Sequence, residues 1–173
     1  MLNFNELDLL NKKLEEFFSE YDIELTFRVG EEFAYFYEKD VVNYSLTTLG
    51  KQDVYFKKFF HKIDNRIENV DIFMLSVLHE VGHSQTLEDI IDDDLYEQEQ
   101  RVKETLDGNK KTDNYIYFSL PSEMAATLWA IDFIIENSEK LSVLWTELQN
   151  HIMQFYKDNG VEIDDWGWRQ NYN

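Results

Sequence analysis

The stretch IFMLSVLHEVGH, residues 72–83, predicts the central helix of this protein. Its first seven residues are mostly apolar, which is typical of a buried helix. Positions four apart on a helix lie one above the other on the same face. His79 and His83 therefore direct two imidazoles to one point, and Glu80 lies beside them. Gly82 is a poor helix former, and its presence inside the motif predicts a close backbone contact there.

Two imidazoles one turn apart can bind one Zn²⁺ at about 2.0–2.1 Å each. An adjacent carboxylate can then take a proton from a water molecule at the metal. The motif therefore predicts His79 and His83 as metal ligands and Glu80 as a catalytic base. The alternative is a helix with two ordinary histidines, but the apolar helix that the motif requires is present.

The length and composition predict one domain, spanning residues 1–173, with 43% hydrophobic residues to form a core. A net charge of −19 argues against nucleic acid or an anionic membrane surface as the main partner. The chain has no cysteine, so any zinc must be bound by histidine and carboxylate. We see no signal peptide, and no apolar run approaches the roughly 20 residues of a membrane span. The cytoplasm is the expected location, and the oligomeric state is left open.

The hydrophobic spacing before the motif predicts one helix and a small sheet. Residues 5–21 have the period of an amphipathic helix, and residues 23–29 alternate like a strand. Two further strands, at 33–37 and 41–46, complete a small antiparallel β-meander of about three strands that ends at Gly50. The fold class is therefore α+β, mostly helical, with the meander before the metal-binding helix.

The remaining segments are mainly helical. The pattern predicts a loop at 107–114, a short extended piece at 115–118, and helices at 53–67, 72–85, 95–106, 123–137 and 138–159, the last stopped by Gly160. Asp71 is expected to cap the motif helix, and His61 to lie at the surface or the edge of the core. For the tail, residues 161–173, packing onto the body and a role as an interaction segment both stay open.

Residues 88–99 contain seven acids in twelve positions. We interpret them as a solvated acidic loop and helix start. The alternative is a second cation site, because clusters of oxygen ligands suit Ca²⁺. The ligand spacing and turn glycine of a known calcium loop are missing, which favours the solvated interpretation.

A catalytic zinc site needs a third protein ligand, and Glu123 is the best candidate. It opens a largely apolar helix, where a carboxylate without a partner is costly. Ala126 and Ala130 follow at one-turn intervals, and small residues there allow two helices to approach closely enough to share a metal. The alternatives are a first-turn glutamate that serves the helix dipole, or a ligand from the acidic stretch: Glu88, Asp92 or Glu97.

The two motifs together carry a family resemblance. Residues 79–83 have the His-Glu-x-x-His form of zincins, and EMAATLWA, residues 123–130, resembles the Glu-x-x-Ala-Asn-x-Phe-Ala segment of the ImmA/IrrE-type metallopeptidases. Thr127 stands where that family usually has Asn, and Trp129 where it has Phe. The stretch between the motifs is longer than the family pattern leads us to expect. Similar small zincin-like proteins occur in bacteriophage and mobile-element genomes.

The resemblance implies a zincin-like domain with a gluzincin-like site, in which His79, His83 and Glu123 bind Zn²⁺. Glu80 would serve as general base and later as proton donor. A strand at 41–46 could hold an extended protein or peptide substrate by edge pairing.

The group that stabilises the oxyanion is not identifiable from the motifs, and three residues remain candidates: Tyr115, Tyr117 and His151. Two functions of another class stay open beside a metallopeptidase. One is a catalytically silent zincin fold that captures a partner protein. The other is an acidic surface that mimics nucleic acid and binds a basic protein.

Overall fold

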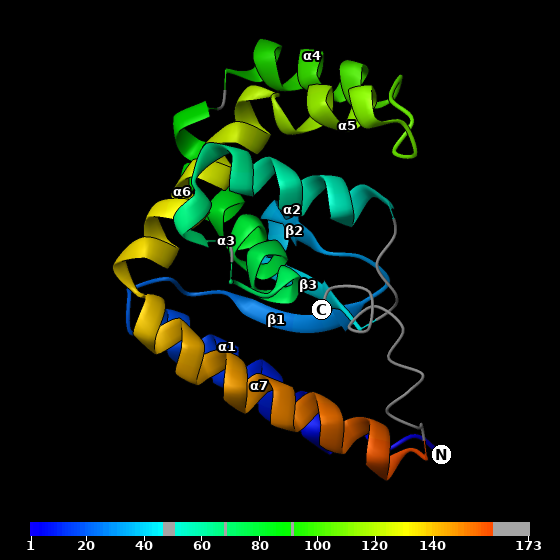
Figure 1. The fold of residues 1–173 in the computed structure, drawn as a ribbon, viewed down its shortest axis with the longest axis vertical. Coiled ribbons are helices and arrows are strands. Elements are labelled where there is room, and N and C mark those ends of the chain that lie inside the picture. The colour runs from blue at the N-terminus through cyan, green and yellow to red at the C-terminus, as the bar shows by residue number, and fades with distance from the viewer. Residues whose placement is uncertain (47–50, 68, 91, 161–173) are drawn as a thin grey trace. The chain divides into compact units, whose positions relative to one another are not determined.

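The computed structural model describes residues 1–46, 51–67, 69–90 and 92–160 (Figure 1). The predicted end of the β region at Gly50 and both alternatives for the tail, 161–173, lie outside the described residues. The chain forms two compact units: unit 1 comprises Met1–Thr48 and Asn137–Asn173, and unit 2 comprises Leu49–Glu136. The predicted α+β, mostly helical class is confirmed. The expectation of a single domain stays a prediction.

Unit 1 pairs its two long helices, α1 (Asn5–Ser19) and α7 (Ser138–Asp158). Both helices match their predictions closely, because each has an apolar stripe of helical period. The buried face of α1 ends in Phe18. Gly160, with a φ of 70°, follows α7 as the predicted stop.

The sheet of unit 1 contains β1 (Thr26–Gly30), β2 (Ala34–Phe36) and β3 (Val41–Ser45) in the order β1-β3-β2. β1 runs parallel to β3, and β2 runs antiparallel to it. The predicted antiparallel meander is therefore wrong, and the sheet is mixed. β3 is the most buried of the three strands, so the central position between the other two suits it best. A short 3₁₀ turn, Tyr37–Lys39, and the left-handed Asp40 join β2 to β3.

This order also changes the interpretation of residues 41–46 as a peptide-binding edge. β3 is paired with β1 along its whole length, from Thr26↔Val41 to Gly30↔Ser45, and with β2 from Val41 to Asn43. A central strand does not present the free backbone groups that edge pairing needs. The predicted edge pairing on this strand is therefore wrong.

Unit 2 is helical over its described residues. Its elements are α2 (Lys51–Ile63), η2 (Asn65–Ile67), α3 (Ile72–Ile90), α4 (Asp93–Lys103), α5 (Lys111–Phe118) and α6 (Pro121–Glu136). The helix predicted at 53–67 is thus interrupted before η2, and the helix predicted at 72–85 continues to Ile90. The extended piece predicted at 115–118 is wrong, because these residues complete α5.

The packing of α5 explains this difference. Asn114 and Phe118, four residues apart, form the buried face of a helix. The Asn114 side chain donates to the carbonyl oxygens of Gly108 (2.6 Å) and Lys110 (2.9 Å), which ties the preceding turn to the helix. Phe118 packs against Phe59 of α2 with ring centroids 5.5 Å apart. This tertiary contact overrides the strand preference of an aromatic-rich run.

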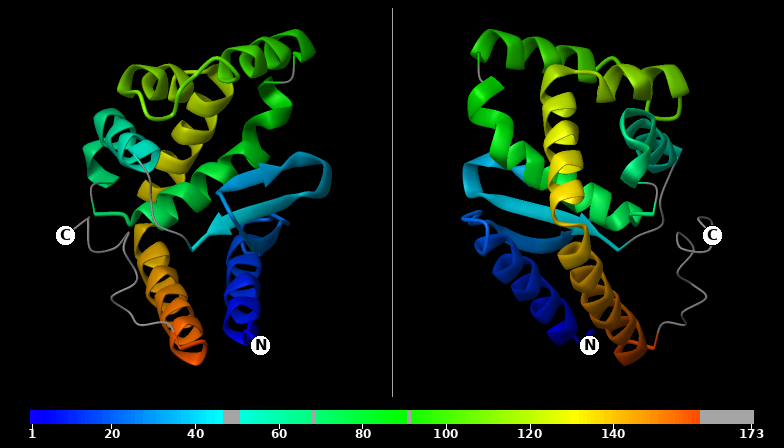
Figure 2. Two further views of the ribbon diagram at one scale, coloured as in Figure 1. Left: turned by 90° about the vertical axis from the view of Figure 1, so that its right-hand side faces the viewer. Right: turned by 60° about the vertical axis from the view of Figure 1, so that its left-hand side comes forward.

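Helix α3 is the buried centre of unit 2 and packs side by side with α6 (Figure 2). Its residues 72–79 are all buried. Asp71 Oδ1 accepts a hydrogen bond from the Phe73 backbone N–H at 2.9 Å, as predicted for the cap. A β-carbon at Gly82 would stand 2.5 Å from the carbonyl oxygen of Ala126 in α6. The predicted close backbone contact at Gly82 is therefore confirmed.

Among the described residues, no single helix is both long and apolar enough to cross a membrane. Helices α5 and α6 meet these criteria only when they are taken together across a 76° bend.

Candidate metal centre

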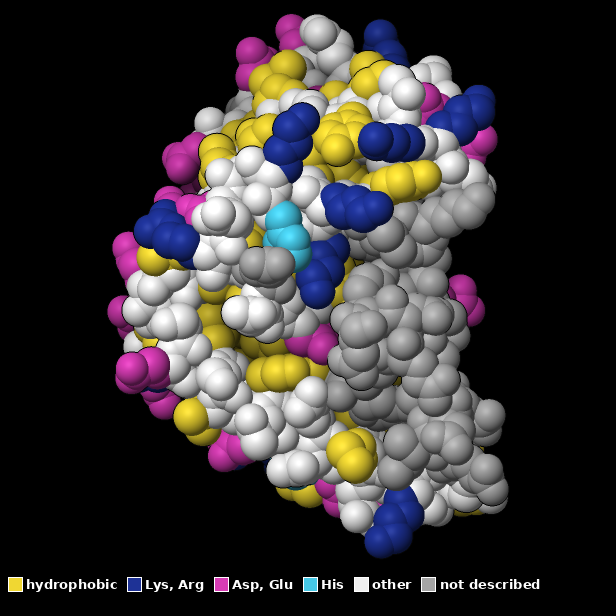
Figure 3. All heavy atoms as spheres, in the orientation of Figure 1, with side chains coloured by type: hydrophobic (Ala, Val, Ile, Leu, Met, Phe, Trp, Pro, Cys, Tyr) yellow, Lys and Arg dark blue, Asp and Glu magenta, His cyan; other side chains and the backbone are white. Residues whose placement is uncertain are grey.

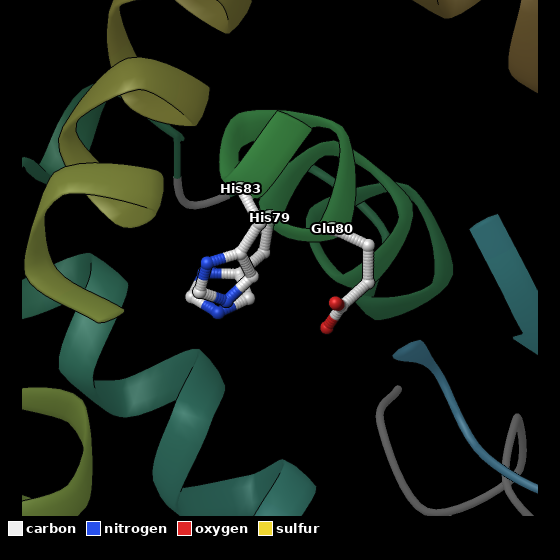
Figure 4. A group of neighbouring side chains, drawn as sticks. All are labelled: His79, Glu80 and His83. Atoms are coloured by element: carbon white, nitrogen blue, oxygen red, sulfur yellow. The ribbon is translucent and has the colours of Figure 1, made fainter. Parts of the chain in front are cut away.

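The two histidines of the motif lie on one face of α3 with their rings together, and Glu80 extends from the same turn (Figure 4). One ligand atom from each of His79, Glu80 and His83 lies within 4.8 Å of the others. His79 is buried, whereas Glu80 and His83 are half-buried. The helical spacing that predicted this group has therefore brought all three side chains to one place.

Glu123, in the first turn of α6, joins the two histidines. Its Oε2 lies 2.9 Å from His79 Nε2 and 3.3 Å from His83 Nε2. In a tetrahedral zinc site with bonds of about 2.0–2.1 Å, neighbouring ligand atoms lie about 3.4 Å apart. The two distances from the Glu123 oxygen come close to this value, and two imidazole nitrogens with one carboxylate oxygen are a ligand set that zinc accepts. The same ligand set suits other transition metals, so it does not identify zinc.

The other proposed third ligands lie elsewhere. Glu88, Asp92 and Glu97 are all exposed. The Asp92 side chain accepts from the backbone N–H of Asp94 and caps α4, and Glu97 pairs with Arg101 at 3.3 Å. Of the residues described, only those around His79 form a group able to bind a cation, so a second cation site in the acidic stretch finds no support.

The charges of the site are strongly coupled. Burial opposes ionisation of His83, but its hydrogen bond to Glu123 and the negative charges of Glu123 and Glu80 outweigh this effect and raise the His83 pKa. Burial favours the neutral form of Glu123 in the same way. The hydrogen bonds and positive charges of His79 and His83 outweigh it and hold the Glu123 pKa well below its ordinary value. Glu123 is therefore ionised although its residue is only 2% exposed.

Thr127 holds the far side of the His79 ring. Its Oγ1 lies 3.2 Å from His79 Nδ1, and the residue is fully buried on α6. When Nδ1 carries the proton and donates it to this hydroxyl, Nε2 is left as the metal-binding atom. Thr127 stands at the position where ImmA/IrrE-type metallopeptidases usually have Asn, and its hydroxyl contacts the His79 ring.

Aromatic side chains surround His79 on the remaining sides. The rings of Phe56 and Phe60, both on α2, lie 5.0 and 6.2 Å from the His79 ring. Phe56 also packs against Phe118 of α5 at 5.1 Å. This packing restricts the imidazole to one orientation and excludes water from that side of the site.

The sequence did not predict the roles of Glu99 and Lys103 on α4. Lys103 Nζ lies 2.6 Å from Glu123 Oε1. Glu99 is buried at 3% exposure and binds Ser122, so the prediction of a solvated acidic stretch is wrong for this residue. Both residues lie in a strongly charged segment, and their i,i+4 spacing does not distinguish them from the exposed pair Glu97 and Arg101.

The three candidates for oxyanion stabilisation differ in their surroundings. The Tyr115 ring lies beneath Lys62 (5.3 Å) and Lys111 (5.8 Å), in the region of α2 and α5 where basic side chains gather in Figure 3. The Tyr117 ring lies 5.1 Å from Lys103 Nζ, which connects it to Glu123. His151 lies in unit 1, where its Nδ1 is 2.7 Å from Glu6 Oε2. Tyr117 is thus the candidate that described contacts link to the site.

The fourth histidine, His61 of α2, is half-buried, as expected for the edge of the core.

Comparisons of the chain with protein-family models, curated proteins and solved structures found no significant match. The resemblance to ImmA/IrrE-type metallopeptidases therefore stays a prediction from the two short motifs.

Proposed function

We propose that the protein is a zinc-dependent metallopeptidase that hydrolyses a peptide bond in a protein substrate. One observation carries the proposal: Glu123 Oε2, from a second helix, meets the Nε2 atoms of His79 and His83 at 2.9 and 3.3 Å. Glu80 lies on the same turn as His79 and completes the group. The resemblance of residues 79–83 and 123–130 to ImmA/IrrE-type enzymes supports the same function.

Each of these residues has its own role in the proposed hydrolysis. A bound Zn²⁺ would polarise the substrate carbonyl and make water more acidic. Glu80 accepts a proton from the attacking water, and the remaining hydroxyl joins the carbonyl carbon. Glu80 then returns the proton to the amide nitrogen as the C–N bond breaks, which yields a carboxylic acid and an amine. His79, His83 and Glu123 hold the metal, and Thr127 keeps His79 in the required orientation.

The test compares Glu80→Gln with the wild type on a library of quenched fluorescent peptides. The variant should keep its zinc, because its ligands are intact, and lose hydrolysis by at least 100-fold, as the loss of a general base implies. Glu88→Gln is the matched control, since Glu88 is an exposed acid on the same helix. Full activity in Glu80→Gln would contradict the assigned role of Glu80.

A second candidate function is a catalytically silent binding protein, and Lys103 is the observation that favours it. Its ammonium group already compensates the buried Glu123 carboxylate at 2.6 Å, so a metal is not required to offset the burial of that charge. This function predicts a tight protein partner and no cleavage products in the same peptide assay.

A further inference from the structure

Helix α4 contacts the first turn of α6 through two side chains, Glu99 and Lys103. The two are four residues apart and therefore share one face of α4. Each contacts one of two consecutive residues, Ser122 and Glu123. The helix thus contacts α6 at the turn that supplies the third metal ligand.

Glu99 fixes the backbone of that turn. Its Oε1 accepts a hydrogen bond from the Ser122 backbone N–H at 2.8 Å, and its Oε2 accepts one from the Ser122 hydroxyl. The first N–H groups of a helix have no partner within the helix, so a carboxylate there supplies a cap and a favourable charge. Because Glu99 is 3% exposed, the interaction is shielded from water.

Lys103 fixes the side chain of Glu123. Its Nζ lies 2.6 Å from Glu123 Oε1, while Glu123 Oε2 is the oxygen that meets His79 and His83. One oxygen of the Glu123 carboxylate therefore contacts Lys103, and the other contacts the two histidines. The Lys103 side chain is only 20% exposed and lies against the Tyr117 ring, so it is itself held in place.

We propose that Lys103 is a positioning residue that makes Glu123 a metal ligand through Oε2 alone, and that Glu99 positions the turn on which Glu123 stands. This inference rests on the proposed function, in which Glu123 binds the metal. A carboxylate whose second oxygen donates no electrons to the metal leaves a coordination position open, as a catalytic zinc site requires.

Lys103→Met tests the inference, because methionine keeps an unbranched apolar side chain and removes the charge. Zinc affinity, measured by competition with a fluorescent chelator, should fall by about tenfold or more, the usual effect of losing a partner of a metal ligand. X-ray absorption at the zinc edge should show an added oxygen, as Glu123 turns to bind through both atoms. Lys103→Arg keeps the charge and the donors, and should restore most of the affinity.

Arg101→Met is the matched control, since Arg101 lies on the same helix in an exposed pair with Glu97. Unchanged affinity in Lys103→Met would overturn the inference. Tighter binding would also overturn it, because it would mean that Lys103 acts only as a positive charge that repels the metal. Circular dichroism of each metal-free variant shows whether the helices have formed.

Glu99→Gln provides the second measurement. The amide keeps the shape of the side chain but removes its charge, so the cap on Ser122 is weakened. We expect a severalfold loss of zinc affinity with helix content retained, whereas unchanged affinity would remove Glu99 from the inference. If the wild type itself bound no zinc, the proposed function would fail together with the inference. If the wild type and Lys103→Met bound zinc equally, only the inference would fail.

Discussion

Gly82 of α3 lies directly against the backbone of Ala126 in α6. A β-carbon at Gly82 would stand 2.5 Å from the Ala126 carbonyl oxygen and 3.0 Å from its Cα. His79 and His83 flank this contact on one helix, and Glu123 lies one turn before it on the other. The contact therefore sets the distance between the helices that carry the proposed ligands, and a side chain at position 82 would push them apart.

Gly82→Ala should destabilise the protein, although alanine is the better helix former. Overpacking costs about 1–3 kcal/mol, and a clash with backbone falls at the upper end because the backbone has little freedom to move. The gain in helix propensity is about 1 kcal/mol, so we expect a net loss of about 1–2 kcal/mol in urea denaturation, with weakened zinc binding. Gly30→Ala is the control, since its new β-carbon would meet the Asn43 side chain and not a backbone. A Gly82→Ala protein as stable as the wild type, with full zinc affinity, would refute this account of the contact.

Thr127→Val removes the hydroxyl beside His79 Nδ1 and keeps the buried volume. Loss of such a partner lowers metal affinity by about 10–100-fold in comparable sites, and we expect a fall of at least tenfold in chelator competition. Thr146→Val is the control, because the Thr146 hydroxyl only donates to the Ser142 carbonyl oxygen on the exposed side of α7. Equal affinity in Thr127→Val and the wild type would show that the hydroxyl does not orient His79.

Zinc binding should weaken on acidification because it requires His83 to be neutral. The His83 pKa is raised above its ordinary value of 6.5, mainly by Glu123 acting against the effect of burial. In the metal-free protein, the stabilisation from protonated His83 is therefore complete below pH 6.5 and is lost as the pH rises through the raised pKa. Zinc must displace this proton, so its apparent affinity should fall about tenfold per pH unit below that pKa. Calorimetry in buffers of different ionisation enthalpy measures the displaced proton, and zinc binding at pH 6.5 without proton release would contradict the expectation.

The residues of the site that could be predicted are those governed by local helix geometry. The i,i+4 spacing placed His79 and His83 together, and the isolated carboxylate of Glu123 on an apolar helix indicated a buried partner. The glycine inside the motif indicated a close backbone contact at that point of the helix. Each of these inferences depends on one helix at a time, which is why sequence alone was sufficient.

The remaining features depend on pairing between distant segments. The order of the strands follows from β3 being the most buried, and alternation alone does not reveal which neighbours a strand takes. Lys103 and Glu99 act on the next-but-one helix, and in a charged stretch they resemble solvated residues until that helix is placed beside them. The aromatic run 115–118 has strand propensity, but its contacts with α2 stabilise a helix instead.

Elemental analysis of the purified, untagged protein tests the central claim most directly. We predict about one zinc per chain in the wild type and in Glu97→Gln, which changes an exposed acid, and loss of the metal in Glu123→Gln, which changes the buried ligand. No bound metal in the wild type, after zinc is added and the excess removed, would contradict the three-ligand site. His79, His83 and Glu123 would then form only a buried ion-pair cluster completed by Lys103.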